Sequence, residues 1–384
     1  MEVLRNVWRT ARRQSLGFVL GAVLAVVACL VGLQPRVTVI VRPAEDGGAT
    51  GVGQAGGSDD YTPTFGWIRH DEAIQENLDP QKTLQFADTP AGQAALSSQE
   101  DVFLWRAVRH AAGRSPTDQG WYPNVNQRDV GCCVGTGYKH GVDALLAVQR
   151  QVGLPEEWKP VSVEVIYAGS RVEVGGGRIS GDGSVGAWAA RWCRDWGVVS
   201  MEVHGRHDLR EFLPRRAREW GRREVGVPDD LEPIAKQHPV RSTALVRTWA
   251  DVERAVRQGY PVVVCSDQGF RMERDSTGRA RPQGQWMHCM VVLGVRTQPA
   301  GAFILNSWGD QAHTGPRVPP DMPPAGFWAD AAVVHRMVGQ GDSFALSDAV
   351  GFPKRKLDWY VIERPTAADL LARGFDFWKG IQVW

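Results

Sequence analysis

The segment QRDVGCC, residues 127–133, places its second cysteine six residues after its glutamine. Farther along the chain, His288 lies in an apolar run, and residues 306–309 read NSWG. A thiol, an imidazole and a side-chain amide are the parts of a nucleophile, its base and the group that orients the base. A thiol attacks a carbonyl only as thiolate, so an imidazole must take its proton while a third group holds the ring in one tautomer. The sequence therefore predicts nucleophilic catalysis by a cysteine.

The order and spacing of these residues resemble the papain family of cysteine peptidases. Gln127 precedes Cys133 by the family's separation between its oxyanion-hole glutamine and its nucleophile, and Gly131 stands where the family has glycine. Cys133, and not Cys132, is therefore the predicted nucleophile. Three positions depart from the family pattern, where Val130 replaces a disulfide cysteine, Cys132 a small residue and Val134 an aromatic residue.

The C-terminal half supplies the stronger match, because residues 306–309 reproduce the family's asparagine motif unchanged. His288 follows Cys133 by 155 residues (288 − 133) and Asn306 follows it by 173 (306 − 133). Papain-like enzymes have roughly 130 to 150 residues here. An insertion accounts for the excess, and we place it in the charged stretch of residues 204–238.

The resemblance implies an α+β, two-lobed papain-like fold, with a helical lobe carrying Cys133 and an antiparallel β lobe carrying His288 and Asn306. It implies that His288 acts as acid and base and that Asn306 orients its ring. Gln127 and the backbone N–H of Cys133 would hold the oxyanion. Trp308 would shield the bond between His288 and Asn306 from water.

A third stretch, Asp182-Gly183-Ser184 followed by a helical run to Trp196, resembles the family segment in which glycines line the substrate cleft. By position, Gly183 and Ser184 are expected to bind an extended substrate, together with Met287 beside the predicted base. A glycine-rich surface turn that caps a helix is the alternative.

Hydrophobic periodicity predicts helices over residues 133–152 and 249–258 and strands over residues 262–265, 287–295 and 303–306. A turn at residues 297–301 would fold the last two strands into a hairpin and bring His288 close to Asn306. The nucleophile then opens a helix, whose N-terminal partial positive charge favours a thiolate.

Composition describes a globular chain of 384 residues with a net charge of +1 and 43% hydrophobic residues. Basic and acidic residues nearly balance, which argues against nucleic acid as a partner. No metal site and no cofactor are predicted, because the His and Cys residues lack the close spacing of zinc ligands. Cys132 is expected either to be inert or to form a reversible disulfide that masks the enzyme.

The N-terminus predicts a membrane anchor, since residues 16–33 carry no charge and follow the basic segment 1–15, which holds Arg5, Arg9, Arg12 and Arg13. The excess of positive charge on the leading side places the N-terminus in the cytoplasm and the catalytic domain outside it. A cleaved secretory signal and a lipoprotein signal ending at Cys29 are the alternatives.

The remaining chain divides into a flexible linker (34–63), a helical N-terminal extension or prosegment (64–116), the catalytic domain (117–364) and a C-terminal extension (365–384). The extension is expected to hold amphipathic helices near residues 70–86 and 98–112. Its sequence leaves open whether it is removed. The oligomeric state is not predicted.

These features predict a membrane-tethered cysteine peptidase acting on peptide or protein substrates. A catalytically silent papain-like domain that binds peptides or partners is the alternative from another class, motivated by Val130, Cys132 and Val134. An amidase or transpeptidase would use the same Cys-His-Asn set with a different acceptor.

Overall fold

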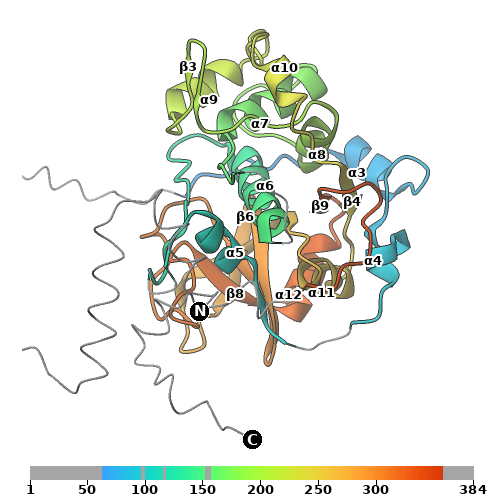
Figure 1. Ribbon diagram of the computed structural model, residues 1–384, viewed down its shortest axis with the longest axis vertical. Coiled ribbons are helices and arrows are strands. Elements are labelled where there is room, and N and C mark those ends of the chain that lie inside the picture. Colours follow the sequence, from blue (N-terminus) through green and yellow to red (C-terminus); the bar gives the residue numbers. More distant parts are fainter. Residues whose placement is uncertain (1–62, 97–99, 116–117, 152–156, 358–384) are drawn as a thin grey trace, which may run out of the picture. The chain divides into compact units, whose positions relative to one another are not determined.

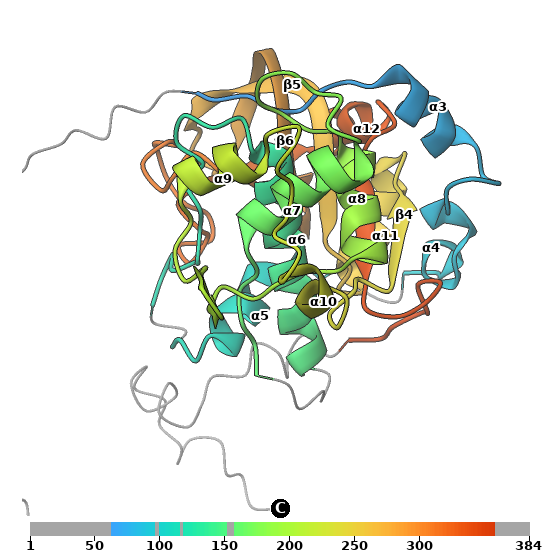
Figure 2. The same cartoon turned by 90° about the horizontal axis from the view of Figure 1, so that it is seen from above.

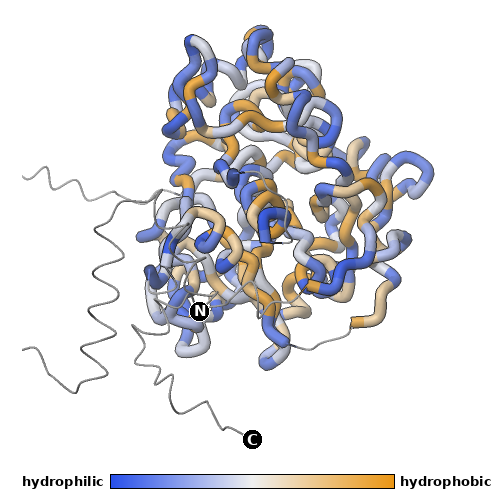
Figure 3. Tube along the Cα trace, viewed as in Figure 1, coloured by the Kyte–Doolittle hydropathy of each residue, from blue (hydrophilic) through white to orange (hydrophobic). Residues whose placement is uncertain are grey.

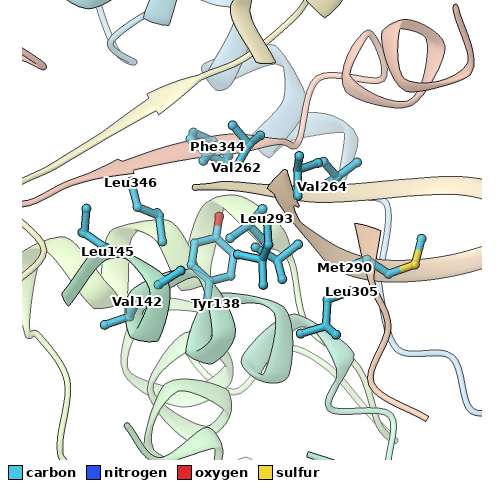
Figure 4. Close-up of a cluster of buried hydrophobic side chains, with 14 of the residues drawn as sticks. Tyr138, Val142, Leu145, Val262, Val264, Met290, Leu293, Leu305, Phe344 and Leu346 are labelled. Carbon is cyan, nitrogen blue, oxygen red and sulfur yellow. The ribbon is translucent and has the colours of Figure 1, made fainter. Parts of the chain in front are cut away.

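Helix α6 (Cys133–Gln151) begins at the predicted nucleophile and is buried on nearly all sides, as expected for a helix enclosed by protein. Two of its glycines face strands. A Cβ at Gly137 would lie 3.1 Å from the Cys289 sulfur, and one at Gly141 would lie 2.9 Å from Leu346. Glycine therefore lets the helix backbone approach the sheet closely. Beside these glycines, Tyr138 and Leu145 pack against the sheet residues (Figure 4).

The computed structural model describes residues 63–96, 100–115, 118–151 and 157–357. The helices before residue 200 are α3 (Asp71–Leu78), the 3₁₀-helix η2 (Phe86–Asp88), α4 (Pro90–Gln93), α5 (Leu104–Ala111), α6, α7 (Val163–Gly169), the π-helix η3 (Ser170–Val174) and α8 (Gly186–Asp195). The later helices are α9 (Pro214–Trp220), α10 (Glu232–Ala235), α11 (Trp249–Arg257) and α12 (Ala331–Val338). The strands are β1 (Val102–Phe103), β2 (Val203–His204), β3 (His207–Asp208), β4 (Ser242–Leu245), β5 (Val262–Arg274), β6 (Ala280–Thr297), β7 (Ala300–Leu305), β8 (Gly326–Asp330) and β9 (Phe344–Ser347).

Among the described residues, seven strands form one antiparallel sheet in the order β4-β9-β5-β6-β7-β8, with β1 added against β6. The predicted hairpin is confirmed, because β6 turns directly into β7 with Thr297 paired to Ala300. Strands β5 and β6 extend well beyond the predicted ranges. Their register shifts after Ser266, which pairs with His288, and such irregularities interrupt the alternation that marks a strand in the sequence.

Helices α11 and α12 pack on the sheet, and α6 separates the sheet from a second group of helices. Helices α7 to α10 lie together on one side, the sheet lies on the other, and α6 runs between them (Figures 1 and 2). The predicted α+β fold with a helical lobe and an antiparallel β lobe is thus confirmed. Hydrophobic residues concentrate in the central strands, α6 is mixed, and the turns around β3 and α9 are mostly hydrophilic (Figure 3).

The predicted N-terminal extension packs on both parts of the fold. In β1, Val102 pairs with Val295 of β6, and the next helix, α5, lies against α6. Helix α3 covers only the first half of the predicted 70–86 stretch, because the chain turns after Leu78.

The predicted anchor, residues 16–33, lies outside the described residues. In the part of the chain that the structure describes, no helix combines the length and the apolar character needed to span a bilayer.

Candidate active site

Cys133 is the first residue of α6, and its side chain is fully buried. Burial raises the pKa of the Cys133 thiol well above its usual value, although the backbone N–H of Cys289 faces the sulfur and acts in the opposite direction. The thiolate expected at this helix start is therefore not favoured in this form of the protein. Cys132 points away into a separate cluster that contains Val130 and Tyr167.

His288 is held by one ring nitrogen only. Its Nε2 lies 2.9 Å from Asn306 Oδ1, while its Nδ1 is buried and makes no hydrogen bond to any described group. Burial lowers the pKa of His288 to about 4, although the bond to Asn306 acts in the opposite direction. The imidazole is therefore neutral, with a lone pair available on Nδ1.

Asn306 follows β7, so the hairpin fixes its position relative to His288. Its Oδ1 also accepts the backbone N–H of Ser307 at 2.7 Å, and its Nδ2 lies 3.1 Å from Nε2 of His313. His313 lies in no motif, so sequence reasoning did not identify it.

Aromatic rings surround His288, the predicted base. Trp308 stacks on His288 with ring centroids 4.5 Å apart and planes at 29°. Trp286 packs edge-on against Trp308 at 4.7 Å, and Phe65 approaches the edge of His288 at 6.2 Å. Trp308 thus covers one face of the His288 ring.

Gln127 is joined to this network through Ser307, whose hydroxyl donates to Gln127 Oε1 at 2.5 Å. Its Nε2 donates to the carbonyls of Val130 at 2.9 Å and Thr64 at 3.1 Å. Both amide hydrogens are therefore engaged. An oxyanion could accept from Gln127 only after one of these two contacts is released.

Thr64 belongs to residues 64–68, here termed the covering segment, which crosses the predicted substrate-binding residues. The N–H groups of Gly66 and Trp67 donate to the carbonyl of Met287 at 3.1 and 3.0 Å. On the other side, the N–H of Ser184 donates to the carbonyl oxygen of Gly66 at 2.8 Å, and the N–H of Ile68 donates to the carbonyl oxygen of Ser184 at 2.9 Å. The chain's own backbone thus lies between Met287 and Ser184.

The covering segment fits too closely for side chains at some positions. A Cβ at Gly66 would lie 2.0 Å from the carbonyl oxygen of Gly131, two residues before Cys133. Gly183 has φ of +108°, and a Cβ there would lie 2.9 Å from Ile68. Glycine at both positions lets two backbones approach directly.

Trp67 anchors the covering segment, because it is 2% exposed and its indole Nε1 donates to Asp342 Oδ2 at 2.8 Å. Asp342 also accepts the N–H groups of Gly186 and Ala187, which open α8, at 2.8 and 2.7 Å. Burial raises the pKa of Asp342 to about 6 despite these bonds. A lone aspartate in a Gly-Asp-Ser sequence carried no signal of this role.

Hydrogen bonds join the loop around Gly183 to the loop that precedes the predicted nucleophile. Asp182 accepts the N–H of Gly131 at 2.9 Å, and Tyr167 accepts the N–H of Gly183 at 3.1 Å. Arg171 donates to the carbonyl of Gly183 from within the helical lobe. The loop that binds the covering segment is therefore joined directly to the loop before Cys133.

No protein-family model matches the chain, and neither does any of the curated proteins. Among solved structures, the chain is similar to xylellain, a cysteine protease from Xylella fastidiosa, with 12% identity, a TM-score of 0.45 and coverage of 74% of this chain and 96% of that one. It is similar to digestive procathepsin L 3 of the Tenebrio molitor larval midgut, with 14% identity, a TM-score of 0.43 and coverage of 74% and 83%. It is also similar to procathepsin B S9 from Trypanosoma congolense, with 13% identity, a TM-score of 0.43 and coverage of 76% and 86%.

Proposed function

We propose that the chain is a cysteine peptidase that hydrolyses peptide bonds through an acyl-enzyme on Cys133. The observation that carries this proposal is the bond of His288 Nε2 to Asn306 Oδ1, with the other ring nitrogen, Nδ1, left without a partner among the described groups. An imidazole fixed by one nitrogen and carrying a lone pair on the other is arranged as a base.

In the proposed reaction, His288 Nδ1 takes the proton of Cys133, and the thiolate attacks the carbonyl carbon of the peptide bond. The oxyanion accepts hydrogen bonds from the Cys133 N–H and the Gln127 side chain. The imidazolium then gives its proton to the leaving amine, and a thioester remains. His288 next deprotonates a water molecule that attacks the thioester, and the carboxylic acid product and the free thiol are released.

The covering segment supports peptides as the substrate class. Its extended backbone makes hydrogen bonds with Met287 and Ser184 on both sides, the way a cleft recognises the main chain of a peptide regardless of sequence. The same contacts keep the enzyme latent. With the segment in place, burial holds both Cys133 and His288 in their neutral forms.

We further propose that residues 16–33 anchor the chain in a membrane with the catalytic part outside the cytoplasm. The uncharged run and the arginines that precede it support this orientation. Alkaline carbonate should leave the protein in the membrane fraction, and protease added to the outer side should degrade it. Release by carbonate together with a mature N-terminus near residue 30 would indicate a cleaved signal, and a lipid-modified Cys29 would indicate a lipoprotein.

A catalytically silent peptide-binding domain is the second candidate. Two observations favour it, because both Gln127 amide hydrogens bind backbone carbonyls and burial raises the pKa of the Cys133 thiol. An amidase or transpeptidase would form the same acyl-enzyme and pass the acyl group to another acceptor. Transfer to an added amine, in preference to water, would identify that activity.

The deciding experiment treats the full-length chain, reduced and in detergent, with a thiol-directed epoxide and locates the adduct by mass spectrometry. We expect a Cys133 adduct in Trp67→Ala, in which the covering segment is loosened. The adduct should disappear in the double variant with Cys133→Ala and weaken strongly with His288→Ala. Cys132→Ala is the matched control and should leave labelling unchanged. Absence of labelling and of peptide hydrolysis in Trp67→Ala would favour the binding domain.

A further inference from the structure

His313 contacts the predicted catalytic set but has no part in the reaction as proposed above. It is 4% exposed and lies in the loop that follows Asn306. Its Nε2 lies 3.1 Å from Asn306 Nδ2, and its Nδ1 lies 3.2 Å from the carbonyl oxygen of Met272. Its ring packs against Phe327 with centroids 4.7 Å apart. Both ring nitrogens therefore have defined partners.

The chemistry of these partners determines where the protons lie. The Met272 carbonyl can only accept, so Nδ1 of His313 carries a hydrogen and donates it. A neutral imidazole has one N–H, so Nε2 of His313 must accept, and Asn306 Nδ2 is the donor it faces. The amide of Asn306 is then oriented with Oδ1 toward His288.

The same logic continues to the catalytic base. Asn306 Oδ1 can only accept, so His288 carries its hydrogen on Nε2 and its lone pair on Nδ1. A chain of donors thus runs from His288 through Asn306 and His313 to the Met272 carbonyl. Each hydrogen bond in this chain has a single donor and a single acceptor. The order is set at one end by the Met272 carbonyl oxygen, which can only accept.

The protonation state of His313 is essential to this order. Burial lowers the pKa of His313 to about 3, and the nearby guanidinium of Arg274 acts in the same direction. A doubly protonated His313 would point an N–H at the amide N–H₂ of Asn306, which would favour a flipped amide. The flipped amide would present N–H₂ to His288 and remove the acceptor for its Nε2–H.

The loop that carries His313 is fastened to β5. The backbone N–H of Thr314 donates to the carbonyl oxygen of Met272 at 3.0 Å, and the backbone N–H of Arg274 donates to the carbonyl oxygen of Thr314 at 3.0 Å. The Arg274 side chain also donates to the carbonyl of His313 at 3.2 Å. The histidine is therefore placed by rigid neighbours and can in turn orient Asn306.

We propose that His313 is a positioning residue that fixes the amide orientation of Asn306 and, through it, the tautomer in which His288 acts as base. This proposal rests on the function proposed above. The bond from Ser307 N–H to Asn306 Oδ1 favours the same orientation, so loss of His313 should weaken the tautomer preference without abolishing it. Groups that orient a ligating imidazole from outside are worth about 10- to 100-fold in metal sites, and a similar range is expected here.

Two substitutions separate positioning from packing. His313→Leu removes both hydrogen bonds, whereas His313→Gln can donate from Nε2 to Met272 and accept at Oε1 from Asn306. In the full-length Trp67→Ala background, we expect His313→Leu to lower kcat about 10-fold or more with little change in KM. His313→Gln should recover most of this loss. His140→Leu, which removes another buried histidine from α6, is the matched control and should leave kcat unchanged.

A spectroscopic measurement tests the tautomer without any turnover. In ¹⁵N-histidine-labelled protein, the ring nitrogen shifts of His288, assigned through their loss in His288→Gln, should report a hydrogen on Nε2. This population should fall in His313→Leu and be kept in His313→Gln and His140→Leu. An unchanged His288 tautomer in a folded His313→Leu variant would overturn the proposal, as would equal loss of kcat in the Leu and Gln variants. Failure of the proposed function would show differently, as absent hydrolysis in Trp67→Ala with the tautomer shifts intact.

Discussion

The indole Nε1 of Trp67 donates to the carboxylate of Asp342 over 2.8 Å, although 275 positions separate the two residues in the chain. Asp342 also receives the first N–H groups of α8, so one carboxylate joins the covering segment to the helical lobe. Under the proposed function, we expect the accessibility of Cys133 to depend on this contact between distant parts of the chain.

Loss of the Trp67 contact should expose the nucleophile. Trp67→Phe keeps a ring but removes the N–H, and hydrogen bonds to a charged group are worth about 1.5–3 kcal/mol. We expect the alkylation of Cys133 by iodoacetamide to become about 10-fold faster, and faster still in Trp67→Ala. Mass spectrometry after timed quenching measures the rate. Equal rates in wild type and Trp67→Ala would show that this bond does not hold the segment.

A methyl group at Gly66 should displace the covering segment by a different route. The Cβ of Gly66→Ala would lie 2.0 Å from the Gly131 carbonyl oxygen, which belongs to the backbone and cannot rotate away. We expect faster Cys133 alkylation with the fold retained, followed by mass spectrometry and circular dichroism. An unchanged alkylation rate in a folded Gly66→Ala variant would show that the close contact of Gly66 with Gly131 does not keep the covering segment in place.

Asn306→Ala should reduce turnover much more than it reduces stability. It removes the acceptor of His288 Nε2 and leaves the ring free to adopt either tautomer. In the Trp67→Ala background, we expect kcat to fall about 10- to 100-fold, by analogy with the partners that orient metal-binding imidazoles. Steady-state hydrolysis of a fluorogenic peptide provides the test. If activity is equal in the two proteins, Asn306 does not orient the base.

Acid should destabilise the protein through its buried histidines. Burial lowers the pKa of His288 to about 4 and that of His313 to about 3, from about 6.5 in an unfolded chain. The unfolded state then binds more protons, so stability rises with pH from about 4 to about 6.5 and is lost as pH falls. His288 alone contributes up to about 3 kcal/mol. Asp342, whose pKa burial raises to about 6, acts in the opposite direction, as do Asp143, Glu173 and Asp310, whose pKa values burial also raises. The contribution of the histidines is therefore measured as the difference between wild type and a histidine variant.

His140 offers a test of this dependence away from the active site, because burial lowers its pKa well below the usual value. The slope of unfolding free energy against pH is proportional to the number of protons taken up on unfolding. Between pH 4 and 6.5, His140→Phe should reduce that number by as much as one. Urea denaturation at several pH values gives both slopes. Parallel slopes for wild type and His140→Phe would contradict the assignment.

Local relationships were the part of the site that could be predicted from the sequence. The start of α6 at Cys133 follows from its hydrophobic period, and the short turn between β6 and β7 brings His288 and Asn306 together without any distant contact. Trp308 follows Asn306 by two residues and stacks on the base. Each of these depends on neighbours in the chain, where periodicity and turn residues carry a signal.

Contacts between distant segments could not be predicted. The covering segment pairs with Ser184 and Met287. An extended stretch of five residues is too short for its hydrophobic pattern to indicate which segments it pairs with. Asp342 and His313 are single polar residues whose roles exist only where loops meet. The lengths of β5 and β6 were also underestimated, since their register shifts break the alternation of buried and exposed residues.

The direction in which the covering segment enters the cleft decides which of its contacts would break first under tension. Thr64 leads, so a pull from the N-terminal side strains its bonds to Gln127 and Trp308 before it reaches Gly66 or Trp67. Such a pull would therefore release the side-chain amide of Gln127 from Thr64 while the indole of Trp67 is still bound to Asp342. Partial displacement of the covering segment would therefore free the contacts of Thr64 first, and the return of the same few residues would restore them.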